Sequence, residues 1–94
     1  MLKTLEDLVN IIRKRKSLPY DSSYTTKLLK DKSLSIEKVK EEIGELIEAV
    51  ENNSNKIHEA ADVLYHLLVY LEGNGVRIED IMDELEKRKK KKES

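Results

Sequence analysis

The sequence predicts an all-α fold, an antiparallel bundle of about four main helices. Helix-forming residues dominate the 94-residue chain, which contains three glycines and one proline. Apolar residues recur at spacings of three and four in several segments, as they do along one face of a helix. No stretch alternates with a period of two for long enough to indicate a strand. The length fits a single domain, residues 1–94, whose small core we expect oligomerisation to complete.

The first part of the chain predicts one long helix, a loop and a short helix. The long helix is expected from about Leu5 to Lys16, with Thr4 in a capping box at its start. Its apolar stripe consists of Leu5, Leu8, Val9 and Ile12. The only proline, Pro19, indicates a loop over residues 17–23. A short helix over Thr25 to Lys30 is compatible with the sequence that follows.

Two further long helices are expected on either side of an asparagine-rich turn. Ser35 is expected to cap a helix that runs from Ile36 to about Asn52. Its apolar face consists of Ile36, Val39, Ile43, Ile47 and Val50. After the turn, residues 56–71 form a helix that is apolar nearly all round, so we expect it at the centre of the bundle. A last helix is expected over residues 78–90, and the short connections predict antiparallel neighbours.

Composition excludes several functional classes. The 18 basic and 19 acidic residues nearly cancel, which argues against nucleic acid or an anionic membrane as the main partner. The chain has no cysteine, and therefore no disulfide or thiolate chemistry. It has no apolar run that could cross a bilayer and no secretory signal, so the expected compartment is the cytoplasm. The basic run Lys87–Lys92 is interpreted as a solvated helix end; whether the tail at about 89–94 is ordered stays open.

Two acidic pairs need an explanation. Glu42 and Glu45 lie one turn apart on one predicted helix, and Glu59 and Asp62 lie one turn apart on the next. Like charges at this spacing repel each other. If the two helices pack antiparallel, both pairs can face one point and offer four hard oxygen donors, which suit Mg²⁺ or Mn²⁺. Such a site can activate water and neutralise phosphate charge in one place.

Plainer interpretations stand beside this one. A pair of glutamates on an exposed helix face is usually solvated, and Lys38 could form a simple surface ion pair with Glu42. Acids in an otherwise apolar helix are costly to bury unpaired, however, which favours a metal for the second pair. His66 shares a helical stripe with that pair, but a histidine in this position is more often a hydrogen-bonded core residue than a ligand. Tyr65 and Tyr70 are interpreted as core residues.

Five segments, spread over nearly the whole chain, carry a resemblance to a known family. They are Arg15-Lys16, Ser23-Tyr24-Thr25, Lys38 with Glu41-Glu42-x-x-Glu45, the stretch from Glu59-Ala60-Ala61-Asp62 to Tyr65-His66, and Glu84-Leu85 with Arg88. Together they resemble phosphoribosyl-ATP pyrophosphohydrolase, a family of all-α nucleoside triphosphate pyrophosphatases. The acidic pairs alone mark only the superfamily, whereas Ser-Tyr-Thr together with Tyr-His is more specific. The chain departs from the pattern in two expected loops, at Pro19 and at Asp31-Lys32-Ser33.

The resemblance implies Mg²⁺-dependent hydrolysis of phosphoribosyl-ATP to phosphoribosyl-AMP and pyrophosphate, the second step of histidine biosynthesis. It implies that the metal ligands are Glu42, Glu45, Glu59 and Asp62, and Glu41 is a candidate for activating water. The expected substrate-binding residues are Arg15, Lys16, Ser23, Tyr24, Thr25, Lys38, His66 and Arg88. A homodimer or larger homo-oligomer is expected. Two alternatives remain: a housecleaning nucleoside triphosphate pyrophosphohydrolase of the same superfamily, and a non-catalytic helical interaction module.

Overall fold

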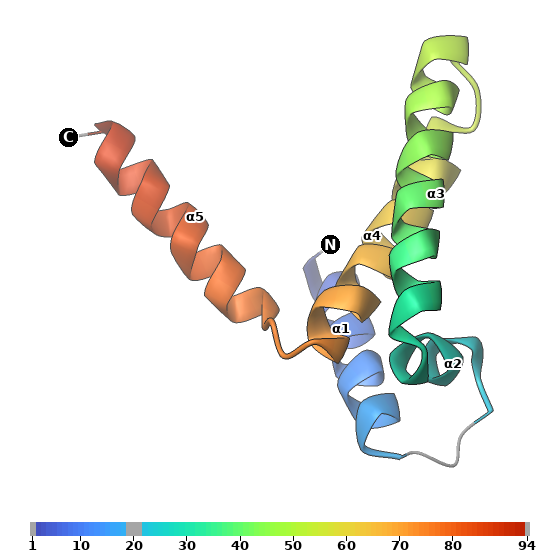
Figure 1. Cartoon of the computed structure of the whole chain (residues 1–94). Helices are drawn as coiled ribbons and strands as arrows, with labels where there is room; N and C mark the ends of the chain where they lie inside the picture. The colour runs from blue at the N-terminus through green and yellow to red at the C-terminus, as the bar shows by residue number, and fades with distance from the viewer. Residues whose placement is uncertain (1, 19–21, 94) are drawn as a thin grey trace.

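The computed structural model describes residues 2–18 and 22–93, and every regular element within them is a helix. The helices are α1 (Leu2–Ser17), α2 (Tyr24–Lys30), α3 (Lys32–Asn52), α4 (Lys56–Gly73) and α5 (Ile78–Glu93), as Figure 1 shows. The predicted all-α fold is confirmed, including the short helix before residue 30. Pro19 lies outside the described residues. Among the helices that the structure describes, none combines the length and the apolar character needed to span a membrane.

Helices α3 and α4 form an antiparallel hairpin, as the short connection between them predicted (Figure 1). The turn depends on Asn53 and Asn55, whose φ angles of 52° and 51° lie in the left-handed region. Asparagine tolerates this region better than most residues do. Inside the turn, the backbone N–H of Ser54 donates to the carbonyl of Ala49 at 2.9 Å and closes the end of α3.

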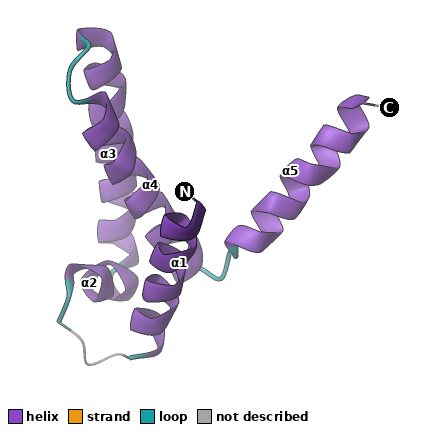
Figure 2. Ribbon diagram, turned by 180° about the vertical axis from the view of Figure 1, so that it is seen from behind, coloured by secondary structure: helices purple, strands orange, loops and turns teal. Residues whose placement is uncertain are grey.

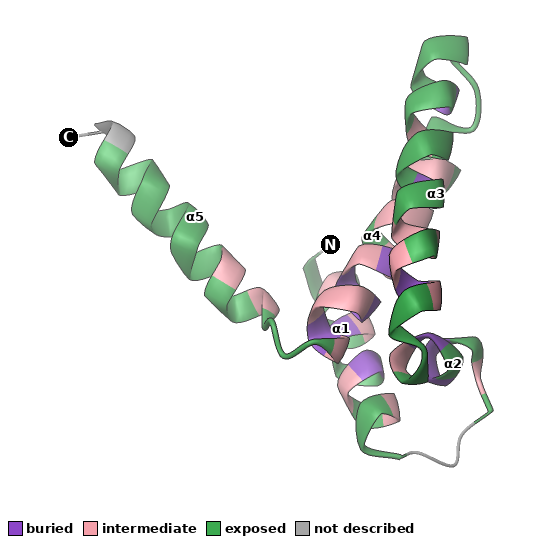
Figure 3. Ribbon diagram, in the orientation of Figure 1, coloured by how far each residue is buried: buried purple, intermediate pink, exposed green. Residues whose placement is uncertain are grey.

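The core lies where α1, α2 and α3 pack around the second half of α4. Its buried residues are Val9, Ile12, Leu28, Leu68 and Val69. Helix α4 contacts all four other described helices, which confirms the central position predicted from its apolar surface. In Figure 3 the buried residues concentrate in this region, while α5 and the tip of the hairpin are mostly exposed. The core therefore stabilises one end of the hairpin and leaves the other end open to solvent.

Helix α5 projects away from the other four helices, as both Figure 1 and Figure 2 show. Its junction with α4 is held by Arg13, whose Nε and Nη2 donate to Glu72 at 2.8 and 2.9 Å and whose Nη2 also donates to Glu79 at 2.6 Å. Glu72 in turn accepts from the backbone N–H of Ile78 at 3.2 Å. The single chain therefore does not close a four-helix bundle. Because α5 is helical to Glu93, the basic run after residue 86 belongs to a helix.

Two predicted helix starts are wrong. Helix α3 begins at Lys32, where the side chain of Asp31 accepts from the backbone N–H of Leu34 at 3.1 Å, so Asp31 is the cap and Ser35 is buried inside the helix. Asp31 also ends α2, which leaves a one-residue junction where a loop was expected. Helix α1 begins at Leu2, so Thr4 lies within it and does not cap it. In both cases the helix begins three or four residues, about one turn, before the predicted start.

Candidate metal centre

The hairpin brings the two predicted acidic pairs together. Glu42 and Glu45 come from α3, and Glu59 and Asp62 come from the first half of α4. One carboxylate oxygen each of Glu42, Glu45 and Glu59 lies within 4.8 Å of the other two. Asp62 belongs to a second group of the same closeness that shares Glu59. A hollow of about 230 Å³, lined in part by Glu45 and Glu59, opens beside these carboxylates toward the tip of the hairpin.

Two oxygens of this cluster are buried without a hydrogen-bond partner. Within the described residues they are Oε2 of Glu42 and Oε2 of Glu59, and Glu42 is only 9% exposed. Burial raises the pKa of Glu42, and the neighbouring carboxylates of Glu45 and Asp62 raise it further. Buried acceptors without partners are costly. A divalent cation would pair both oxygens and offset the repulsion, so these residues fit a hard metal ion.

A second cluster joins α2 to α4 beside the carboxylates. The hydroxyl of Tyr24 lies 2.9 Å from Nε2 of His66, and Nδ1 of His66 lies 2.7 Å from the backbone oxygen of Asp62. Because a carbonyl only accepts, Nδ1 carries the hydrogen, and in the tautomer with this single hydrogen Nε2 accepts from Tyr24. His66 is thus a buried, hydrogen-bonded histidine, as one interpretation of the sequence held, and it braces the turn of α4 that carries Asp62.

Tyr65 has a contact that its interpretation as a core residue did not include. Its hydroxyl shares a hydrogen bond with the hydroxyl of Thr25, and its ring stacks on Tyr24 with 6.2 Å between centroids. The side chain of Ser23 caps α2 by accepting from the backbone N–H of Thr26 at 3.2 Å. The Ser-Tyr-Thr and Tyr-His segments therefore contact each other.

Lys38 and Glu41 lie on α3 as an exposed ion pair, with 3.3 Å between Nζ and Oε2. The hydrogen bond to Glu41 raises the pKa of Lys38. Burial raises the pKa of Tyr24, and the positive charge of Lys38 opposes that rise. Lys38 thus places a fixed positive charge near the Tyr24 hydroxyl. Glu41 is exposed, unlike the neighbouring Glu42, and takes no part in the two groups of close donors.

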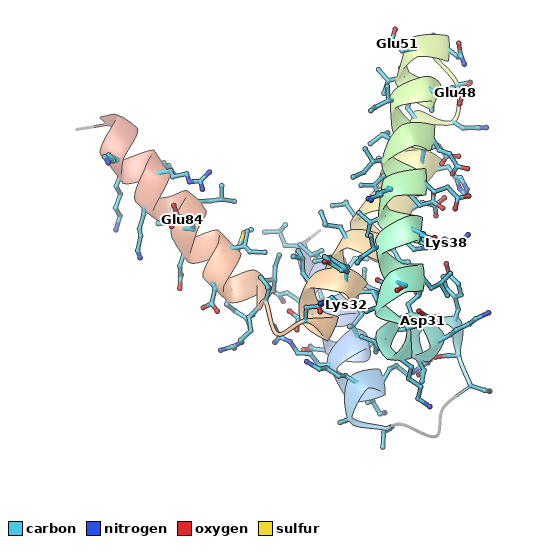
Figure 4. The ribbon with its side chains drawn as sticks, viewed as in Figure 1. Asp31, Lys32, Lys38, Glu48, Glu51 and Glu84 are labelled. Carbon is cyan, nitrogen blue, oxygen red and sulfur yellow. The ribbon has the colours of Figure 1, made fainter. Side chains whose placement is uncertain are left out.

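Three predicted substrate-binding residues do not join the carboxylates within one chain. Nζ of Lys16 donates to the backbone oxygen of Glu72 at 2.9 Å, near the end of α4 opposite the hairpin tip. Arg15 belongs to the same last turn of α1. Arg88 donates to Glu84 at 3.0 Å on α5. Figure 4 shows Glu84 on the projecting helix, far from Lys38 and Glu48 on α3.

Comparisons with known proteins agree with the resemblance. A family model described as phosphoribosyl-ATP pyrophosphohydrolase matches residues 5–89. A histidine biosynthesis bifunctional protein of Pyrococcus furiosus is 42% identical over 95% of this chain and 43% of its own length. A phosphoribosyl-ATP pyrophosphatase of Methylobacterium nodulans is 44% identical over 90% of this chain and 82% of its own. One from Methanococcoides burtonii is 37% identical over 94% of each.

The lengths of these relatives differ. The chain spans less than half the length of the bifunctional relatives that it matches. It spans more than four-fifths of the length of several relatives that carry the pyrophosphatase name alone. No solved structure matches the chain.

Proposed function

This chain belongs to the phosphoribosyl-ATP pyrophosphohydrolase family, and on that premise we propose that it hydrolyses phosphoribosyl-ATP to phosphoribosyl-AMP and pyrophosphate, the second step of histidine biosynthesis. The observation that carries the proposal is the pair of buried, unpartnered oxygens of Glu42 and Glu59 within a cluster of carboxylates. Such an arrangement is unfavourable by itself and becomes favourable with a cation.

Mg²⁺, with Mn²⁺ as a substitute, would be held by Glu42, Glu45, Glu59 and Asp62. When bound, it would supply charge neutralisation for the triphosphate and polarise the attacking water. Glu42 and Glu59 lie on helices α3 and α4, which pack against each other, so their oxygens need little rearrangement to bind. The hydrogen bond from Nδ1 of His66 to the backbone oxygen of Asp62 likewise helps to hold Asp62 in position for binding.

The remaining residues have roles that follow from their positions. Lys38 would bind phosphate oxygens, since its positive charge acts electrostatically on the Tyr24 hydroxyl and on Glu42. Glu41 would help to orient or deprotonate water, and its ion pair with Lys38 would have to open for that role. Tyr24 and Thr25 would line the substrate side of α2, held by His66 and Tyr65.

The proposal includes a symmetric homodimer or larger homo-oligomer. Large apolar side chains are exposed along the hairpin, at 42–88% of their surface; they are Ile43, Ile47, Val50, Ile57 and Leu64. An apolar surface of this kind is typical of an interface, and a second copy of the chain would cover it. An assembly of two chains would also let α5, with Arg88, approach the carboxylates of another copy.

The acidic cluster alone does not separate this function from a housecleaning pyrophosphohydrolase. The contacts of Tyr24 with His66 and of Thr25 with Tyr65 favour the first, because they join the two segments specific to the family. Pyrophosphate release from phosphoribosyl-ATP, ATP and a dNTP panel, each with Mg²⁺ and with EDTA, tests the choice. Mg²⁺-dependent release from phosphoribosyl-ATP alone is the expected result. Release from dNTPs at equal rates would favour housecleaning, and no release would favour an interaction module.

A further inference from the structure

The carboxylates and the exposed apolar residues lie on opposite faces of the hairpin. Positions two residues apart are separated by about 160° around a helix, so Glu45 faces away from Ile47 on α3. In the same way, Glu59 faces away from Ile57 on α4. Lys38, about two turns before Glu45, lies in Figure 4 on the side of α3 that is turned away from α5. The apolar face of the hairpin, and not the carboxylate face, is therefore turned toward α5 of the same chain.

Within one chain, the described residues place few positive charges beside the carboxylate face. Lys38 acts electrostatically on Glu42. Lys16 donates to the far end of α4, and Arg88 donates to Glu84 on α5, away from the cluster. A triphosphate carries several negative charges, and fixed positive charges at its oxygens stabilise the charge that develops in hydrolysis. Positive charge from outside this chain would therefore complete the site.

Helix α5 has an apolar stripe that continues into basic residues. Met82 lines a groove of about 530 Å³ between α1 and α5, and Leu85, three residues further, is 49% exposed. Arg88 and Lys89 follow Leu85 at spacings of three and four, so they lie on the same side of the helix. Both are exposed in the single chain. This side of α5 therefore offers apolar contact along its first half and positive charge along its second.

The direction of α5 is set by contacts between helices. Arg13 on α1 donates to Glu72 on α4 at 2.8 Å and to Glu79 on α5 at 2.6 Å. Glu72 is buried, and a buried ion pair is costly to break. The network therefore holds α5 away from the apolar face of the hairpin, as Figure 1 and Figure 2 show. This arrangement leaves α5 in position to contact a second molecule.

We propose that α5 of one copy lies on the carboxylate face of another copy's hairpin and supplies Arg88 and Lys89 to the bound triphosphate. When two hairpins pack through their apolar faces, each turns its carboxylate face outward, toward the α5 that projects on that side from its partner. In a twofold dimer this contact is made twice, so both sites are completed. The inference rests on the proposed function for the identity of the substrate, and on the proposed oligomer for the contact between hairpins.

The competing interpretation is that the basic half of α5 is only a solvated helix end. That interpretation does not explain why Met82 and Leu85 are 47% and 49% exposed on a helix whose direction is fixed. It also leaves the carboxylate face without a counterpart. A basic surface of a second copy is complementary to this acidic face before substrate binds, and to the triphosphate afterwards.

Two inactive variants, each altered in a different part of the site, provide the test. Glu42→Gln loses a proposed metal ligand and keeps α5, whereas Arg88→Ala with Lys89→Ala keeps the carboxylates. Each should lower the rate of pyrophosphate release from phosphoribosyl-ATP by about a hundredfold. After mixing in equal amounts and exchange of chains, they should regain about a quarter of the unaltered rate, because half of the dimers are mixed and each mixed dimer has one intact site.

Lys87→Ala with Lys90→Ala is the matched control. Both side chains belong to the basic half of α5 but lie outside the stripe. This variant should therefore keep the rate of the unaltered chain within about twofold, since it leaves the proposed phosphate contacts in place.

Cross-linking tests the contact without substrate or metal. The chain has no cysteine, so Glu48→Cys and Lys89→Cys each introduce a single reactive thiol. In Figure 4, Glu48 on α3 lies far from Glu84 on α5 within one chain. When the two variants are mixed, a bifunctional maleimide should join one chain of each. Ile47→Asp in both variants, which opposes the proposed contact between hairpins, should prevent the link.

Three results would overturn the inference: a mixture no more active than its two components, an unchanged rate in Arg88→Ala with Lys89→Ala, or no cross-link between chains. Any of these, together with pyrophosphate release by the unaltered chain, leaves the proposed function intact. A cross-link between chains without release from phosphoribosyl-ATP by the unaltered chain would contradict only the proposed function.

Discussion

The hydroxyl of Tyr24 donates to Nε2 of His66 across 2.9 Å, and the same imidazole donates through Nδ1 to the backbone oxygen of Asp62. One hydrogen-bonded path thus runs from α2 to the turn of α4 that carries a proposed metal ligand. The ring of Tyr65 packs edge-on against His66, with centroids 5.0 Å apart, and limits its movement. The position of Asp62 therefore depends on a residue 38 positions earlier in the chain.

Replacing Tyr24 with phenylalanine removes the donor and leaves a buried imidazole nitrogen unpaired. A lost partner of this kind costs about 1–3 kcal/mol, so Tyr24→Phe should lower the free energy of unfolding by about that amount. Urea denaturation measures the change. Tyr70→Phe on α4 is the control, because it removes a hydroxyl that is not in this path. Equal destabilisation by the two variants would show that the contact with His66 contributes nothing particular.

The junction of α4 and α5 should be sensitive to acid. Hydrogen bonds from Arg13 lower the pKa of Glu72 and bring that of Glu79 to about 2. Because these values lie below the ordinary glutamate value of about 4.3, the stabilisation is complete above that pH and is lost as the pH falls toward 2. Arg13→Gln should lower the free energy of unfolding by about 2 kcal/mol at pH 7, because it leaves the buried Glu72 without its positively charged partner. The variant should also lose less stability than the unaltered chain when the pH falls.

Arg77→Gln is the matched control for Arg13. The guanidinium of Arg77 pairs with Glu79 at 3.2 Å on the surface, so its loss should change stability by less than about 0.5 kcal/mol. Chemical denaturation at several pH values between 2 and 7 gives the change in stability of each variant and its dependence on pH. If the free energy of unfolding of Arg13→Gln fell with pH as steeply as that of the unaltered chain, this network would not be what holds the junction.

Without metal, the carboxylate of Glu42 should destabilise the fold. Burial and Glu45 raise its pKa, so in EDTA stability should decline as the pH rises through the ordinary glutamate value toward the raised one. Glu42→Gln keeps the shape and removes the charge. It should therefore raise the free energy of unfolding in EDTA, by about 1 kcal/mol, and lose the stabilisation by Mg²⁺. Thermal unfolding with EDTA and with Mg²⁺ checks this prediction. Glu48→Gln, an exposed change on α3, should neither raise the stability in EDTA nor lose the stabilisation by Mg²⁺.

The exposed apolar residues of the hairpin should control assembly. Ile47 is 58% exposed in the single chain, and a charge there would oppose its burial between two copies. Ile47→Asp should shift the mass measured by light scattering from that of a dimer or larger assembly to that of one chain. Lys40→Asp, on the same helix but outside the apolar set, should leave the assembly intact. A monomer in the unaltered protein would contradict the proposed oligomer.

Local patterns in the sequence were sufficient to predict the hairpin of α3 and α4 and the acidic pairs that it carries. Apolar spacing located α3 and α4, and the asparagine-rich turn made them antiparallel. The antiparallel arrangement allows Glu42-x-x-Glu45 and Glu59-x-x-Asp62 to approach each other, and the structure brings them together. The start of α3 was missed because two residues, Asp31 and Ser35, both suit a cap. In the structure the cap is Asp31, which ends α2 and begins α3 at the same position.

Features that depend on distant residues could not be predicted. The direction of α5 depends on Arg13 and two glutamates 59 and 66 positions later, and no local pattern links them. Periodicity placed Tyr65 in the core, but its hydroxyl partner Thr25 lies 40 positions earlier.

The most direct test of the account is the rate of pyrophosphate release from phosphoribosyl-ATP at saturating Mg²⁺, compared between the unaltered chain and Glu42→Gln. If the buried carboxylate of Glu42 holds the ion, the amide should lower the rate by about a hundredfold, while Glu48→Gln should retain it. Equal rates for Glu42→Gln and the unaltered chain would contradict the assignment of this cluster as the metal centre.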